Sequence, residues 1–356
     1  MYKGVDKKDN MTTFTGEKMT GFMLLTPVFK QLKNMPASFT HVDNHSKLRD
    51  IRETVKSYCL LDNLKKYNKR NEIASNVFSS QFKLAESLVI GNIDAANNLT
   101  NFPFSLTIEH NDLSYSFVDI NNTVGEYIHW RKIHSCGFSL VKPSYETTVG
   151  HTVFKKDQSE VFKIYYEIEN FIQFITDVKK VDLVSGSCID NKIDNELTDE
   201  FIFVRDLLCV IAVAFLTLNE GGDLLIKIGD SNTLPVVQLI YLCSISFKNV
   251  SFFYPEFLIS GFKARYLICK EFKNESSGYG RKLLEINRDY SEENKLINLF
   301  NINEVEKSFI EWIVNANNNN MKRQINYYKD MVSKKDESHI IKYKTLLVMA
   351  QCSLPT

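Results

Sequence analysis

Short apolar runs alternate with longer segments of helical spacing between residues 76 and 273. Six of these runs have the length and the aromatic or β-branched content of buried strands, namely residues 116–120, 137–141, 181–184, 224–228, 250–254 and 266–269. Helical segments at 201–219 and 232–247 separate the later runs. Because strands that alternate with helices form a sheet covered on both faces, this pattern predicts an α/β fold with a mostly parallel sheet.

The two flanks of this core have a different pattern. Residues 1–75 are polar, and the apolar spacing of 47–69 predicts a mostly helical N-terminal extension before the core domain of 76–273. Residues 274–356 are expected to form a helical C-terminal extension. In that extension the asparagine run 315–320 is expected to be a loop, and it follows an apolar stripe made of Ile302, Val305, Phe309, Trp312 and Ile313.

Charge is distributed unevenly although 43 basic and 43 acidic side chains give a formal net charge of zero. Residues 1–75 hold 14 basic and 8 acidic side chains, residues 261–356 hold 16 and 12, and residues 76–260 hold 13 and 23. A basic excess marks surfaces that bind polyanions, so RNA contact is expected from the flanks rather than from the core. Solvated helix faces are the simpler explanation of the same excess.

Cysteine usage and the N-terminal residues bear on location. The seven cysteines form no CxxC pair, which argues against a disulfide framework and a zinc ribbon. The N-terminus has no apolar signal region, and the longest apolar stretch, 207–218, is shorter than the roughly 20 residues that cross a bilayer. We expect an intracellular, cytoplasmic protein without a membrane span or a bound metal.

Several motifs in order resemble a known family. The segments FVDI at 117–120, GEYIHWRK at 125–132 and GFSL at 137–140 resemble the cofactor region of FtsJ-like RNA methyltransferases, in particular the cap-specific mRNA 2′-O-methyltransferases. The segments GGDLLIK at 221–227, FYP at 253–255 and RYLICK at 265–270 are similar to later motifs of that family. The resemblance implies a Rossmann-like methyltransferase fold and S-adenosyl-L-methionine as the cofactor.

The resemblance also implies a catalytic tetrad of lysine, aspartate, lysine and glutamate. The two lysines fall on Lys83 and Lys227, whereas Ser187 and Ala264 occupy the two carboxylate positions. A group that takes a proton from a ribose hydroxyl needs neighbours that tune its pKa, and neither replacement carries charge. Substitute carboxylates nearby in sequence are Asp182, Asp190, Asp223 and Asp230.

The expected cofactor loop is altered as well. By resemblance, Asp119, Asn121, Asn122 and Gly125 would line it, but Thr123 and Val124 stand where the family has glycines. Glycine permits close backbone approach to a ligand, and β-branched residues do not. The sequence therefore predicts weak or absent binding of S-adenosyl-L-methionine.

Three interpretations follow from these residues. The first is an inactive methyltransferase-like subunit of an mRNA capping or RNA-modification assembly, similar in kind to the inactive small subunit of poxvirus capping enzymes and expected at a viral or plasmid transcription site in the cytoplasm. The second is an active cap 2′-O-methyltransferase with a divergent site, and the third is an unrelated structural protein. In the first interpretation the partner is another capping or transcription subunit, contacted through the flanks. The apolar stripe around Trp312 would anchor this contact, or would pack on the core and leave it to the N-terminal extension.

Overall fold

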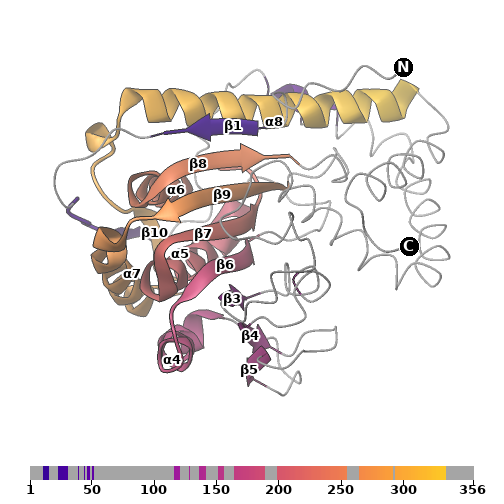
Figure 1. The fold of residues 1–356 in the computed structure, drawn as a ribbon. Helices are drawn as coiled ribbons and strands as arrows, with labels where there is room; N and C mark the ends of the chain where they lie inside the picture. The colour runs from indigo at the N-terminus through magenta and orange to yellow at the C-terminus, as the bar shows by residue number, and fades with distance from the viewer. Residues whose placement is uncertain are drawn as a thin grey trace, which may run out of the picture.

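A computed structural model gives the structure of the chain. It describes residues 11–15, 23–30, 39, parts of 44–51, 116–120, 128, 136–141, 151–155, 164–188, 199–254 and 264–333 except 292. These residues form an eight-stranded sheet, a separate two-stranded sheet and the helices packed against them (Figure 1). None of the helices in this part of the chain is long and apolar enough to cross a membrane.

Five strands form the parallel half of the large sheet. In spatial order they are β5 (His151–Lys155), β4 (Cys136–Val141), β3 (Ser116–Asp119), β6 (Val181–Cys188) and β7 (Leu218–Ile228). The chain winds outward from β3 in both directions, so the strand order reverses between β3 and β6. In open sheets of this kind, ligands bind beside the carboxyl ends of the strands at such a reversal.

Three antiparallel strands complete the sheet beyond β7. They are β9 (Arg265–Phe272), β8 (Phe247–Phe253) and β1 (Met11–Phe14), and β1 pairs antiparallel with β8. All six predicted strands are present, and the mostly parallel sheet confirms the expected Rossmann-like methyltransferase fold. The strands β1 and β5 were not predicted.

The connecting helices supply a large part of the core. They are α4 (Ile164–Thr176), α5 (Asp199–Thr217), α6 (Leu234–Ser246) and, after the short η3 turn (Asn274–Ser276), α7 (Ser277–Asp289). The α5 segment 207–215 is buried at every residue, as expected of a helix that is apolar all round. Strand β7 follows α5 directly, and its fourth residue, Gly221, adopts φ 78°, a conformation that side chains disfavour.

The N-terminal segment contains strands that the helical expectation missed. In addition to β1, strand β2 (Val28–Lys30) pairs with β10 (Lys295–Asn298) in the two-stranded sheet. Helical residues do occur between 44 and 51, inside the expected helix of 47–69. The rest of that helix and the final C-terminal helix expected near Lys344 lie outside the described residues.

The C-terminal helix corrects two expectations. Helix α8 (Lys307–Ser333) follows the η4 turn (Ile302–Glu304), runs beside β1, and continues without a break through the asparagine run (Figure 1). The run is therefore helical and not a loop. The apolar stripe packs inward, because Phe309 and Ile313 are fully buried and the Trp312 ring stacks on Phe252 at 4.9 Å between centroids. It is thus no exposed anchor for a partner.

Candidate functional site

Lys227 lies at the carboxyl edge of the parallel strands, one residue before the end of β7. Its register partner in β6 is Ser187, and its partner in β9 is Tyr266. Ala264 immediately precedes β9, so it lies two residues before Tyr266. Three of the four positions implied by the tetrad are therefore close together at one edge, and Lys83 lies outside the described residues.

The groups beside Lys227 are neutral at both carboxylate positions. Ser187 contributes a hydroxyl on a half-buried residue, and Ala264 contributes a buried methyl group. A hydroxyl can exchange hydrogen bonds with an ammonium, but it adds no charge that would orient the amine or tune its pKa. The arrangement retains the lysine without a charged group at either of these two positions.

Two of the substitute carboxylates lie at the wrong edge of the sheet. Asp182 is five residues before Ser187 in an extended strand, a separation of about 16 Å. Its carboxylate accepts hydrogen bonds from the Ser116 backbone N–H at 2.8 Å and from the Asn219 amide at 3.0 Å. These contacts hold the amino ends of β3, β6 and β7 together, so Asp182 cannot serve Lys227.

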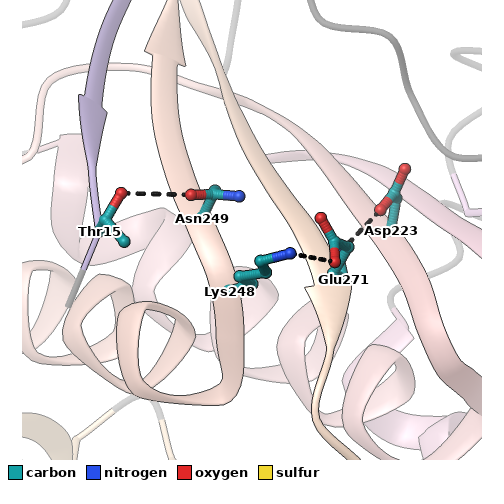
Figure 2. Close-up of polar contacts among 5 residues, drawn as sticks. All are labelled: Thr15, Asp223, Lys248, Asn249 and Glu271. Atoms are coloured by element: carbon teal, nitrogen blue, oxygen red, sulfur yellow. Dashed lines mark hydrogen bonds and ion pairs between the residues drawn. The ribbon is translucent and has the colours of Figure 1, made fainter. Parts of the chain in front are cut away.

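Asp223 forms a hydrogen bond away from Lys227, as Figure 2 shows. Its Oδ1 accepts the Glu271 backbone N–H at 3.0 Å, and the Glu271 side chain forms an ion pair with Lys248 at 2.9 Å. Thr15 donates to Asn249 at 3.2 Å beside this cluster. Glu271, inside β9, has φ 61°, which is uncommon for a residue other than glycine, and the bond to Asp223 stabilises this backbone conformation. Asp223 is four residues, or about 13 Å, from Lys227 along β7.

Asp230 alone among the described substitutes lies at the edge of Lys227. It is two residues beyond the end of β7, and its Oδ1 accepts a hydrogen bond from the Asn320 amide of α8 at 2.8 Å. Asp190, the fourth candidate, lies outside the described residues. If the protein is an active enzyme, Asp230 is therefore the described substitute residue that could place a carboxylate near Lys227.

Asp119 is the one described residue among the four expected to line the cofactor site. Asp119 ends β3 and is fully buried, and its Oδ1 accepts a hydrogen bond from the Ser185 hydroxyl at 3.1 Å. The carboxylate thus joins β3 to β6 and offers no exposed ligand group to S-adenosyl-L-methionine. The loop residues Asn121, Asn122 and Gly125 lie outside the described residues, so their role stays a prediction. Among the residues described, no group of three or more His, Cys, Asp or Glu side chains could hold a metal ion.

A buried arginine next to this edge was not foreseen from the sequence. The Arg265 side chain is fully buried, and its guanidinium carbon lies 3.7 Å from the centre of the Phe252 ring. Its N–H groups donate to the Gly229 carbonyl, the Tyr254 hydroxyl and the Ser231 hydroxyl, and the longest of these distances is 3.1 Å. All of these acceptors are neutral. The RYLICK motif contains Arg265, but only the fold brings its partners together.

Asn317 of α8 is the centre of the same network. Its Oδ1 accepts from Arg265 at 2.6 Å and from the Ser231 hydroxyl at 2.9 Å, and its amide donates to the carbonyls of Phe39 at 2.9 Å and Ser231 at 2.8 Å. Asn318 accepts a further bond from Asn44 at 3.0 Å. The asparagine run therefore ties the N-terminal segment, the β7–α6 turn and β9 to one helix. We call Arg265, Ser231 and Asn317 the arginine cage.

Glu200 holds the same turn from the other side. Its carboxylate accepts hydrogen bonds from the backbone N–H groups of Asn232 and Thr233 at 2.8 Å each and from the Thr233 hydroxyl at 2.7 Å, and so fixes the two residues that lead into α6. Although the residue as a whole is only half-buried, its carboxyl group lies against this buried turn. Burial raises the pKa of Glu200 to about 7, and the bonds from Thr233 and Asn232 oppose that rise.

Cys188 ends β6 beside Ser187, but it does not have the properties of a nucleophile. It is buried, and burial followed by the nearby Asp206 charge raises the pKa of its thiol well above the ordinary value. Thiolate is the reactive form, so this cysteine is a core residue.

The sheet order and the carboxyl-edge lysine define the chain as a Rossmann-like α/β protein of the methyltransferase type. No protein-family model matches it. Curated relatives are cap-specific mRNA (nucleoside-2′-O-)-methyltransferases. The 1A protein of Caenorhabditis briggsae is 25% identical over 249 residues, which is 63% of this chain and 26% of that protein. The Xenopus laevis protein is 26% identical over 54% of this chain and 26% of its own length. The Mus musculus protein is 29% identical over 46% of this chain and 22% of its own length.

These relatives support an FtsJ-like family for the chain, in agreement with the motifs, and the chain is a methyltransferase-like protein related to the cap 2′-O-methyltransferases. It spans about a quarter of the length of the curated relatives it matches. Among solved structures, a ribosomal RNA methyltransferase from Plasmodium falciparum has a TM-score of 0.33 at 16% identity, covering 46% of this chain and 88% of that one. An O-methyltransferase family protein from Burkholderia thailandensis has a TM-score of 0.26 at 12% identity, covering 45% and 51%.

Proposed function

We propose that this chain is a catalytically inactive methyltransferase-like protein that acts as a regulatory or scaffolding subunit of an mRNA capping or RNA-modification assembly. The observation that carries the proposal is the register of Ser187 opposite Lys227, with Ala264 at the adjoining strand. Both positions are neutral, and Asp182 and Asp223 lie at the other edge of the sheet. The loss of two members of a four-residue proton-transfer group removes most of its rate enhancement, because such groups act as a unit.

The buried carboxylate of Asp119, which accepts a hydrogen bond from Ser185, supports the same proposal. S-adenosyl-L-methionine would supply the methyl group in an active relative, and here we expect it to bind weakly or not at all. A dissociation constant in the low micromolar range, equivalent to about −8 kcal/mol, would contradict this expectation.

The decisive experiment is methyl transfer from S-adenosyl-L-methionine to capped RNA by the purified full chain. We expect no turnover from the unmodified protein, and none from a variant that combines Ser187→Asp with Ala264→Glu, because the cofactor loop remains altered. An active cap 2′-O-methyltransferase assayed in parallel shows that the RNA is a competent substrate. Turnover by the unmodified protein that disappears in Lys227→Ala would refute the proposal.

One observation favours the alternative, an active enzyme with a divergent site. Asp230 lies at the edge of Lys227 and could supply the missing charge. If this alternative holds, Asp230→Asn abolishes turnover together with Lys227→Ala. The exposed variant Asn319→Ala on α8 leaves that turnover unchanged and serves as the control.

The proposed partner is another subunit of a capping or transcription complex, and the proposed location is the cytoplasm. The neutral, mixed composition and the acidic core support a protein partner over a polyanion for the central domain. RNA contact through the basic flanks is the proposal for the terminal segments. Because the apolar stripe of α8 is buried, the N-terminal extension is the better candidate for the protein contact.

A further inference from the structure

The N-terminal segment 23–30 has an inner and an outer face that alternate residue by residue. Met23 and Leu25 are buried, and Phe29 packs against the core. The outward positions are exposed, and Leu24 and Val28 among them are 73% and 41% exposed. These outward residues, which we call the outer face, are Leu24, Thr26, Val28 and Lys30. An extended segment that leads into β2 with apolar side chains on its exposed face has the pattern of one that another surface covers.

This face is held firmly from its buried side. The Met23 backbone N–H donates to the Tyr279 hydroxyl at 2.7 Å, and the Thr26 N–H donates to the Leu299 carbonyl at 2.9 Å. The end of β10 is in turn fixed by Gln238 of α6, whose amide donates to the Asn298 side chain at 2.7 Å and accepts the Leu299 N–H at 2.8 Å. Leu24 is therefore exposed on a segment that hydrogen bonds fix to the rest of the fold.

A pair of lysines borders the aliphatic part of the outer face. Lys30 lies directly opposite Lys295 across the two strands, and like charges in that position destabilise a sheet. Among the described residues neither lysine forms an ion pair, although the Lys295 ammonium lies 5.9 Å from the centre of the Tyr290 ring. Strands β2 and β10 contain no acidic residue, and Glu293 is the nearest described carboxylate along the chain from β10. An acidic ligand would relieve the repulsion between the two lysines.

We propose that the outer face is the docking surface for an acidic polypeptide segment of the partner subunit, with apolar side chains that cover Leu24 and Val28. This inference rests on the proposed function and names the surface that the partner uses. The carboxylates of the segment pair with Lys30 and Lys295. A polypeptide fits better than RNA because the centre of the face is aliphatic, whereas RNA contacts rely on basic and stacking side chains.

The test begins with a photo-crosslinking side chain at position 24 of the full chain, expressed in its native cells. The matched control carries the same group at Val178, which is 62% exposed in the turn between α4 and β6. We expect position 24 to capture a protein that mass spectrometry identifies as a capping or transcription subunit with an acidic segment, and position 178 not to capture it. That protein is then purified, and its affinity for the chain is measured.

In the binding measurement, Leu24→Asp and Val28→Asp are expected to weaken affinity by about tenfold or more, as for central contacts of an interface. Val178→Asp changes affinity by less than about twofold. Lys30→Glu weakens binding at low salt and has a smaller effect at high salt, because the charges are exposed. Melting curves of each variant show that the fold is kept.

Other outcomes separate the surface from the function. Capture of RNA, or of a second copy of this chain, at position 24 overturns the docking proposal. A capping subunit that binds all variants with equal affinity also overturns it, and the proposed function then stands with a different surface. Methyl transfer by the unmodified protein overturns the proposed function independently of either result.

Discussion

Replacing Asn317 by alanine tests whether the arginine cage stabilises the fold. The substitution removes four hydrogen bonds, one of them to the buried guanidinium of Arg265. Neutral hydrogen bonds contribute about 1 kcal/mol each and those to charged groups about 1.5–3 kcal/mol. Arg265 keeps its bond to the Ser231 hydroxyl, and alanine favours a helix by a few tenths of a kcal/mol over asparagine. We expect a loss of about 3–5 kcal/mol in the free energy of unfolding.

Urea denaturation followed by circular dichroism measures this loss. Asn319→Ala is the matched control, since Asn319 lies in the same helix but is exposed, and the helix preference is the same in both variants. Ser231→Ala removes only the Ser231 hydroxyl, and its free energy of unfolding should fall by about half as much. This milder variant tests the cage if Asn317→Ala does not fold. A difference below about 1 kcal/mol between the two asparagine variants would refute the role of the cage.

Two further predictions concern acid dependence and packing. Because burial raises the pKa of Glu200 to about 7, the folded state holds this proton more tightly than the unfolded state does, and the Glu200 contribution to stability falls by about 2–3 kcal/mol as pH rises from about 4.5 to 7. Denaturation at several pH values should show that slope reduced in Glu200→Gln, and an unchanged slope would contradict it. Gly137→Ala places a Cβ 2.6 Å from the Phe117 ring, so it should destabilise the β3–β4 pair by about 1–3 kcal/mol in thermal unfolding. If Gly137→Ala unfolds at the same temperature as the unmodified protein, the prediction is wrong and Phe117 can move aside.

The strands at the centre of the sheet were predictable because they are buried on both faces. Residues 181–184 and 224–228 are short runs that are apolar at every position but one, Asp182 and Lys227 respectively, and the structure places them in β6 and β7. Strand β1 has the sequence MTTF and β5 has HTVFK, whose polar residues suit the edges of a sheet and give no such signal. Edge strands are defined by their partners, and the partner of β1 is more than 230 residues away.

The asparagine run shows how tertiary contacts override local preference. Asparagine competes with helix formation in isolation, which favours a loop at 315–320. In the structure Asn317, Asn318 and Asn320 each form a hydrogen bond to a distant segment, and these bonds stabilise the helix.

For the site, the motif spacing placed Lys227 at the end of a strand, and the structure shows it opposite Ser187. The cage around Arg265 could not be predicted, because its members are separated by 34 to 86 residues.

The pairing of β1 with β8 has a consequence for how the protein is made. Thr13 meets Ser251 across a sequence separation of 238 residues, so β1 leaves the ribosome long before its partner exists. At about 5–20 residues per second, that interval is roughly 12–50 s. During this time the Phe14 side chain, which the finished protein buries against Phe309 and Trp312, has no native site. Strand β1 can therefore join the sheet only after β8 has been made, and a nascent chain stalled before α8 would leave the apolar side of β1 uncovered and prone to aggregation.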